Sequence, residues 1–150
     1  MWGLGVQSWW RRAGQRTKLV SDLVSDLDPE AAFRRFIDAF NKEDLPALDD
    51  AWTSPFSYVT NGEAQVFARY RDFVNFEGLR ASGWARTQVS RAEMLLCDDT
   101  SAVIDSTLTR LAADDTEIAS GTLVFVLVRD GDGWKLRVGV NLASFSTGKT

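Results

Sequence analysis

Apolar and polar residues alternate with a period of two near the end of the chain. Apolar side chains recur at every second position: Trp134, Leu136, Val138, Val140 and Leu142. Lys135, Arg137 and Asn141 lie between them, which predicts a strand with one apolar and one polar face. An apolar run at 118–128 comes before it, and residues 130–133, with two glycines, suit a tight turn. The pattern therefore predicts a hairpin whose first strand is central in a sheet.

The same periodicity predicts two further long strands before this hairpin. They cover residues 84–96 and 102–111, and acidic stretches at 98–100 and 114–115 supply the turns. A shorter hairpin is predicted at 56–67, because Asn61 and Gly62 form a dipeptide that favours tight turns.

Helical periodicity dominates the first half. Asp28 and Pro29 form a typical helix start, with a capping side chain before a proline at the first helical position. Apolar residues follow at helical spacing, namely Phe33, Phe36, Ile37 and Phe40, and Asn41 is expected to end the helix. Two more helices are predicted at 44–52 and 68–79. Helices followed by strands predict an α+β fold with an antiparallel sheet.

Composition limits the classes of function. The chain has 150 residues, enough for one domain with its own core, and a net charge of -4, which argues against nucleic acid as a partner. It has no histidine and one cysteine, so a Ser-His-Asp or Cys-His triad is excluded and a structural zinc site is not expected. We therefore expect no metal and no cofactor.

Residues 1–27 differ from the rest of the chain. They combine basic residues with Trp2, Trp9 and Trp10, and residues 19–27 continue with apolar positions at helical spacing. We expect a helical arm that packs on its own domain or on a second copy, with contact to a membrane surface as the alternative. The apolar run before the arginines is too short for a signal peptide or a spanning helix, so a cytoplasmic location is expected.

Several short segments resemble the nuclear transport factor 2-like superfamily, and within it the SnoaL-like domains. They are the residues from Ala32 to Phe40, 43–48 with Trp52, 58–62 and 132–136. The resemblance covers about residues 28–146 and leaves 147–150 as a C-terminal tail. It implies a cone in which a strongly curved sheet wraps around three helices and encloses an apolar pocket. It also implies a homodimer formed on the outer face of the sheet.

The chain departs from the active members of this superfamily. Ketosteroid isomerase-like members keep a carboxylate near the end of the first strand, where this chain has residues 57–61 without an acid. SnoaL-like relatives often carry a histidine in the last strand, where this chain has Val138 to Asn141. Epoxide hydrolase-like members need an Asp-Arg-Asp set, of which Asp105 and Arg137 supply only two parts.

Asp105 is the candidate catalytic residue. It is an acid within an apolar strand, so burial in the pocket would raise its pKa and suit it to proton transfer. The alternative is an exposed strand face or an ion pair with an arginine such as Arg137.

Aromatic and amide side chains are the candidates for binding a ligand. They are Trp52, Tyr58, Tyr70, Phe73, Trp84 and Asn141. The sequence favours a domain that binds a hydrophobic small molecule in an apolar pocket without a complete catalytic set. An isomerase or cyclase using Asp105 and a dimeric interaction module using the outer sheet face and the arm are the alternatives.

Overall fold

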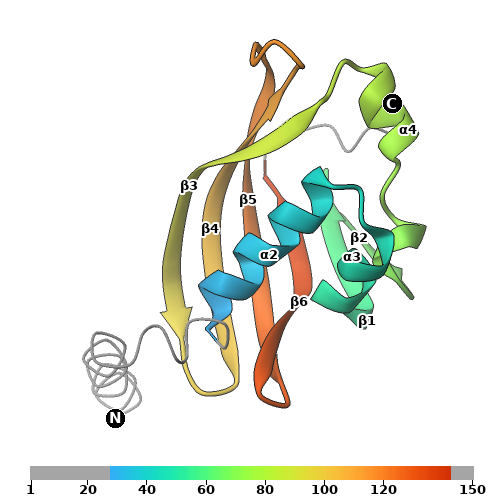
Figure 1. Cartoon of the computed structure of the whole chain (residues 1–150). Coiled ribbons are helices and arrows are strands. Elements are labelled where there is room, and N and C mark those ends of the chain that lie inside the picture. Colours follow the sequence, from blue (N-terminus) through green and yellow to red (C-terminus); the bar gives the residue numbers. More distant parts are fainter. Residues whose placement is uncertain (1–27, 143–150) are drawn as a thin grey trace.

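The computed structural model describes residues 28–142 and shows helices packed on one six-stranded, curved and unclosed sheet (Figure 1). The strand order is β2-β1-β6-β5-β4-β3. Bounds of the strands are β1 Trp52–Thr60, β2 Glu63–Phe67, β3 Arg86–Cys97, β4 Ser101–Leu111, β5 Glu117–Asp130 and β6 Gly133–Asn141. The predicted α+β class is confirmed. The predicted arm at 1–27 and the predicted C-terminal tail at 147–150 lie outside the described residues.

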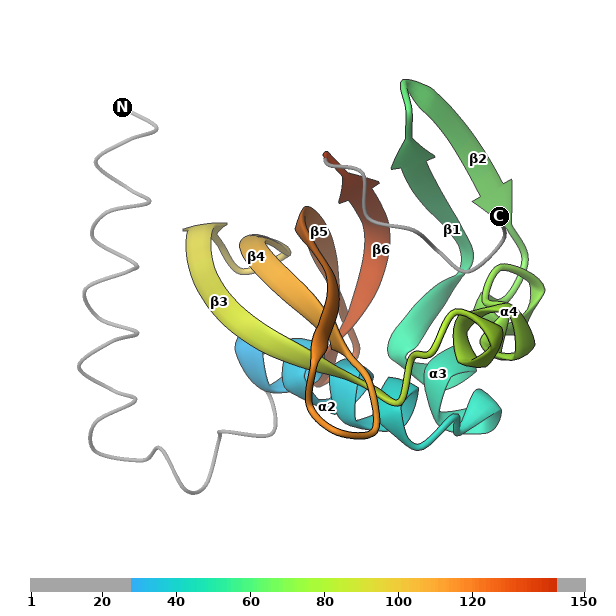
Figure 2. The ribbon, with the colours of Figure 1, turned by 90° about the horizontal axis from the view of Figure 1, so that it is seen from above.

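Helix α2 (Pro29–Asn41) forms as its sequence predicts. The Asp28 carboxylate caps it by accepting a hydrogen bond from the amide of Ala31 at 2.7 Å. Phe33, Phe36 and Ile37 are buried against the sheet, and Asn41 is the last helical residue. The short helix α3 (Leu45–Ala51) follows, and Figure 2 shows α2 and α3 on the same side of the sheet. This side is called the inner face below.

Strand β1 leads to the first difference from the prediction. It pairs with β2 in antiparallel fashion, as expected, but lies parallel to β6 on its other side. The sheet is therefore mixed, because the first hairpin and the last strand join edge to edge. Short-range turn signals cannot reveal such a long-range pairing.

The predicted helix at 68–79 is wrong in its extent. The structure has a turn of 3₁₀ helix, η2 (Tyr70–Asp72), and a separate helix α4 (Phe76–Ala81). The break comes at Asn75, whose side chain accepts a hydrogen bond from the amide of Gly78 at 2.9 Å and caps α4. Asparagine favours such a cap over a helix interior because its side chain competes for backbone groups.

A β-bulge in β6 changes the predicted faces of that strand. Val138 pairs with Val126 while Leu136 pairs with Leu127, so Arg137 has no residue opposite it on β5. Trp134 and Leu136 point inward as expected, but Val138 and Val140 then face outward. Beyond Arg137, the inward positions belong to Gly139 and Asn141.

The outer face of the sheet carries a row of partly exposed apolar side chains. Val103 of β4 pairs with Leu96 of β3 on one side and with Val126 of β5 on the other, and Val138 of β6 continues the row. These valines are half-buried, and Leu96 is 62% exposed. Among the described residues, no helix has the length and apolar character needed to span a membrane.

Candidate ligand-binding pocket

A cavity of about 40 Å³ lies between α2, η2 and the inner face of β1, β4 and β5. Its walls are mainly aromatic and aliphatic. The described residues that line it are Phe36, Ile37, Phe40, Tyr58, Tyr70, Phe73, Val74, Thr87, Leu108, Arg110, Leu123 and Phe125. The volume is enough for about three water molecules.

Both tyrosines of the chain lie in this cavity. The Tyr58 ring contacts Phe73 with centroids 4.4 Å apart, and the Tyr70 ring stacks on Trp52 at 5.2 Å. Burial raises the pKa of Tyr58 to about 12, although the positive charge of Arg110 acts in the opposite direction. Burial also raises the pKa of Tyr70 well above its ordinary value. Both phenols are therefore neutral hydrogen-bond donors at physiological pH.

Arg110 brings a positive charge to the cavity. It lies on the inner face of β4, between Thr87 of β3 and Ala119 of β5, and is only 6% exposed. Burial lowers its pKa to about 10, while the nearby phenols Tyr58 and Tyr70 act to raise it. The guanidinium therefore remains protonated at neutral pH.

Sequence reasoning missed Arg110, although a signal for it exists. Alternate residues of β4 point inward, namely Ala102, Ile104, Ser106, Leu108 and Arg110. The same alternation that buries Ile104 and Leu108 therefore carries Arg110 to the inner face. It also turns Asp105 to the outer face.

Asp105 consequently lies away from the cavity, on the opposite side of the sheet. Its carboxylate forms an ion pair with Arg91 of the neighbouring strand at 2.9 Å. Asp105 therefore does not lie in the pocket, where its carboxylate could have served in acid–base catalysis. The alternative of an outer-face ion pair is what the structure shows, with Arg91 as the partner in place of Arg137.

Arg137 instead holds the irregular part of β1. Its guanidinium donates a hydrogen bond to the carbonyl oxygen of Pro55 at 2.9 Å, next to the point where the β1–β6 register shifts. The bulge at Arg137 thus separates it from Asn141, which is 5% exposed on the inner face beside Leu123. Asn141 is near the cavity but is not among the residues that line it.

Trp52 and Trp84 support the cavity from behind its walls. Trp52 is 1% exposed, and its ring lies edge-on to Phe36 and stacks on Tyr70. The Trp84 indole donates a hydrogen bond to the hydroxyl of Thr87 at 2.9 Å. Of the six predicted ligand-binding residues, the structure brings Tyr58, Tyr70 and Phe73 to the cavity surface.

Gly139 allows Tyr58 to take its place. A Cβ atom added at residue 139 would lie 2.8 Å from two carbon atoms of the Tyr58 ring. Any larger residue would displace the ring, so the lack of a side chain on β6 is what makes room for it.

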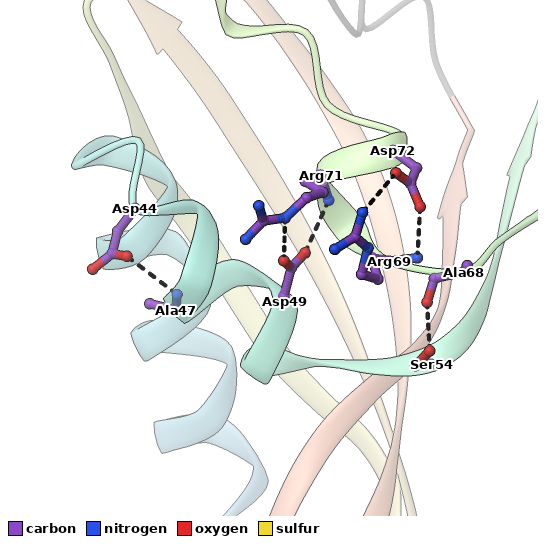
Figure 3. A network of polar contacts seen from close by, with 8 residues as sticks. All are labelled: Asp44, Ala47, Asp49, Ser54, Ala68, Arg69, Arg71 and Asp72. Atoms are coloured by element: carbon purple, nitrogen blue, oxygen red, sulfur yellow. Dashed lines mark hydrogen bonds and ion pairs between the residues drawn. The ribbon is translucent and has the colours of Figure 1, made fainter.

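A network of polar contacts positions η2 and therefore Tyr70 (Figure 3). The Asp49 carboxylate at the end of α3 accepts hydrogen bonds from the backbone amide of Arg71, at 3.0 Å, and from its guanidinium. The Ser54 hydroxyl of β1 donates to the carbonyl oxygen of Ala68 at 2.6 Å. The segment leading into η2 is thus tied to both α3 and β1.

A second hollow, of about 300 Å³, lies on the surface between α2, α3 and the β5–β6 turn. Lys135 lies at its wall and forms ion pairs with Asp50 at 3.6 Å and with Asp130 at 3.4 Å. Charged side chains of both signs line this hollow, whereas Arg110 is the one charged residue among the described residues that line the first cavity. No group of three or more metal-ligating side chains occurs within residues 28–142.

Comparison with models of known protein families shows to which family the chain belongs. A family model described as NTF2-like protein (DUF6841) matches residues 28–144. The chain belongs to this NTF2-like family. The resemblance to the superfamily is therefore confirmed. No curated protein matches the chain.

Solved structures of several other proteins share the fold of this chain. One is a protein of unknown function with a cystatin-like fold from Nostoc punctiforme, at 16% identity and a TM-score of 0.59, covering 77% of this chain and 92% of that one. Another is the Kfla4162 protein from Kribbella flavida, at 20% identity and a TM-score of 0.56, covering 77% and 87%. A third, from Shewanella frigidimarina, is proposed to be a ketosteroid isomerase, at 12% identity and a TM-score of 0.55, covering 74% and 91%. At these identities the likeness establishes the fold alone.

Proposed function

We propose that this NTF2-like protein binds a small molecule in the cavity between α2, η2 and the inner face of the sheet. The observation that carries the proposal is the composition of the cavity wall. Apolar and aromatic side chains surround a few converging polar groups, above all Tyr58, Tyr70 and Arg110. Small-molecule sites have this composition, because apolar walls supply affinity and isolated polar groups fix orientation.

Binding fits the geometry better than proton-transfer catalysis. The described residues that line the cavity include no carboxylate, and Asp105 lies on the other face of the sheet. With its pKa raised to about 12, Tyr58 can donate a hydrogen bond at neutral pH but is not poised to remove a proton. An isomerase or cyclase on this scaffold would need a base from elsewhere.

The proposal is tested with a variant in which a larger side chain fills the cavity and should exclude ligands. Leu108 is 5% exposed and lines the cavity, so Leu108→Phe should occupy much of its volume. Leu95→Phe is the matched control, because Leu95 is 46% exposed and lies outside the cavity wall. Ligand-observed NMR with a panel of compact neutral and anionic compounds provides the measurement.

Native mass spectrometry of the purified wild type adds a search for a molecule that co-purifies. We expect at least one compound to bind the wild type and the control variant but not Leu108→Phe. Binding that survives in a folded Leu108→Phe variant would place the ligand site elsewhere, and a panel without any binder would contradict the proposal.

We also propose that two copies pair through the outer face of the sheet. The row from Leu96 to Val138 supports this, because it presents partly exposed apolar side chains from four adjacent strands. The oligomeric state in solution tests it.

A further inference from the structure

We propose that residues 19–27 of this chain form a helix that packs antiparallel to α2 and fills the surface hollow between α2, α3 and the β5–β6 turn. The occupant is a segment of the same chain that lies outside the described residues. Among the described residues, the hollow shares no lining residue with the ligand cavity, so this docking is independent of the proposed function.

Small side chains leave the space that forms the hollow, which has a volume of about 300 Å³. They are Ala32 and Ala39 of α2 and Ala47 and Ala51 of α3, and the ring of Trp134, 6% exposed, completes the wall. Ala32 and Ala39 are two turns apart on one face of α2, so the hollow extends for about 10 Å along this helix. A second helix fits such a groove, because the side chains of one helix pack between those of another.

The sequence directly before α2 is amphipathic. Apolar residues recur at helical spacing on one side of the segment, namely Leu19, Val20, Leu23, Val24 and Leu27. Nine residues of helix are about 13 Å long, which matches the length of the hollow along α2. A helix of this length is not stable alone in water, so its apolar side needs a surface on which to pack.

The start of α2 brings this segment to the hollow. Leu27 is joined directly to Asp28, whose backbone is extended (φ -90°, ψ 156°), so the preceding chain leaves the axis of α2 at this residue. Ala32, at the wall of the hollow, lies only about 6 Å further along the helix. Helices joined by such a short connection pack as antiparallel neighbours. The outer apolar row, by contrast, lies across the sheet from α2.

The charges around the hollow suit the acidic residues of the segment. The Lys135 side chain is 30% exposed, whereas its ion-pair partners Asp50 and Asp130 are 86% and 58% exposed. The cation is therefore the most enclosed of these three groups. Asp22 and Asp26 lie one turn apart at an edge of the apolar stripe, where a helix in the hollow can direct them toward Lys135.

Hydrogen–deuterium exchange of the full chain, measured by mass spectrometry, tests the docking. Amides of residues 19–27 should exchange at least about tenfold more slowly than in an unfolded chain, at a rate that does not depend on protein concentration. Ala47→Phe places a ring in the hollow and should remove this protection. Ala81→Phe is the matched control, because Ala81 is an exposed alanine of α4 outside the hollow.

Further variants test the segment and the charge that faces it. Leu23→Asn should remove the protection by interrupting the apolar stripe, whereas Ser25→Asn, on the polar side, should leave it unchanged. Lys135→Glu should speed exchange of residues 19–27 by at least about twofold, because it turns an attraction for Asp22 and Asp26 into a repulsion. This variant also tests the hollow if Ala47→Phe does not fold.

Several results would overturn the docking. Fast exchange of residues 19–27 in the wild type would show that the segment does not pack. Protection that persists in a folded Ala47→Phe variant, or that Lys135→Glu leaves intact, would place the segment outside the hollow. Protection that is lost only in Val126→Glu would place it on the outer face of the sheet. Protection that rises with protein concentration would assign the hollow to the segment of a second copy.

Discussion

At the scale of single residues, the buried guanidinium of Arg110 is the least expected feature of the interior. Most of its surroundings are apolar, and burial lowers its pKa to about 10. A lowered arginine pKa means that the native state holds the charge less favourably than the unfolded chain does. Desolvation of the Arg110 charge therefore opposes folding, and the nearby phenols Tyr58 and Tyr70 offset part of that cost.

Arg110→Met is accordingly expected to stabilise the ligand-free protein. Methionine has similar length and no charge to desolvate, so the free energy of unfolding should rise by about 1–3 kcal/mol. Urea unfolding at neutral pH measures this free energy. Arg34→Met, which removes the same charge from an exposed position on α2, is the control and should change stability by less than about 0.5 kcal/mol. A clear loss of stability in Arg110→Met would mean that contacts of the guanidinium outweigh its desolvation.

The two tyrosines provide a direct report on the cavity, because the chain has no others. In the native protein, the ultraviolet absorbance of phenolate should not develop near pH 10, about where free tyrosine ionises. Tyr58 should titrate at about pH 12, and Tyr70 should titrate well above its ordinary pKa. In concentrated denaturant both should titrate near the ordinary value, which is the control. A native phenol that ionises near pH 10 would show that at least one ring is open to solvent.

Alkaline pH should lower stability through the same groups. The folded pKa of each phenol lies above the unfolded one, so their contribution is fully present below about pH 10 and is lost as the pH rises toward 12. Arg110 acts in the opposite direction in this range, since its folded pKa is the lower one. With two phenols against one guanidinium, these three groups together favour unfolding as the pH rises.

At the scale of elements, short-range patterns predicted α2 and α3 well. Asp28 and Asp44 cap these helices as their positions suggest, accepting from Ala31 and Ala47. The four long strands were also predicted with bounds close to the observed ones. These features depend on neighbours along the chain, which a sequence displays directly.

The errors come from interactions between distant segments. The bulge at Arg137 inverts the predicted faces of Val138 and Asn141, and the parallel pairing of β1 with β6 joins segments about 80 residues apart. The error at Asp105 has another origin, because strict alternation from Ile104 would have placed it outside and Arg110 inside. The apolar neighbours of Asp105 suggested that its carboxylate is buried in the pocket, whereas Arg110 is the charged residue of β4 that lines the cavity.

Tyr70 depends on a short element that has little stability of its own. Three residues of 3₁₀ helix cannot hold a position alone, so the Asp49 contacts to Arg71 fix η2 on α3. Asp49→Ala should lower the free energy of unfolding by about 1–2 kcal/mol, because a charge-assisted bond to a backbone amide is lost.

The variant should also shift the tyrosine titration toward the ordinary pKa as the Tyr70 ring loosens. Asp99→Ala, in the exposed β3–β4 turn, is the control and should change neither stability nor titration. If Asp49→Ala left both measurements unchanged, packing of Tyr70 on Trp52 and Phe56 would be sufficient to hold η2.

At the scale of the whole molecule, the sheet separates two kinds of surface. The inner face holds the aromatic core and the cavity, whereas the outer face presents the row of valines around Val126. Resemblance to the superfamily predicted this division, but neither the depth of the cavity nor the residues at its wall could be read from composition. The depth of the cavity and the residues at its wall depend on the pairing register of the strands, which a shift by a single residue alters.

Pairing of two copies can be tested by adding a charge at the centre of that row. Val126→Glu should convert a dimer to a monomer, because a carboxylate in an apolar contact is costly to desolvate. Light scattering after size exclusion measures the mass over a range of concentrations. Thr116→Glu, in the exposed β4–β5 turn, is the control. A wild type that is monomeric at every concentration would contradict the proposal.

The unopposed residue at position 137 has a consequence for how this strand can change. Because it adds one residue to β6, pairing of residue 137 with Val126 would return the strand to simple alternation and shift every later residue by one position. A valine would then meet the Tyr58 ring where Gly139 now leaves space, and the Asn141 amide would turn to the outer surface. A register slip of one residue would therefore close the cavity without altering any residue that lines it. In comparisons among relatives, the presence of this extra residue is consequently as informative about the cavity as the identity of the side chains.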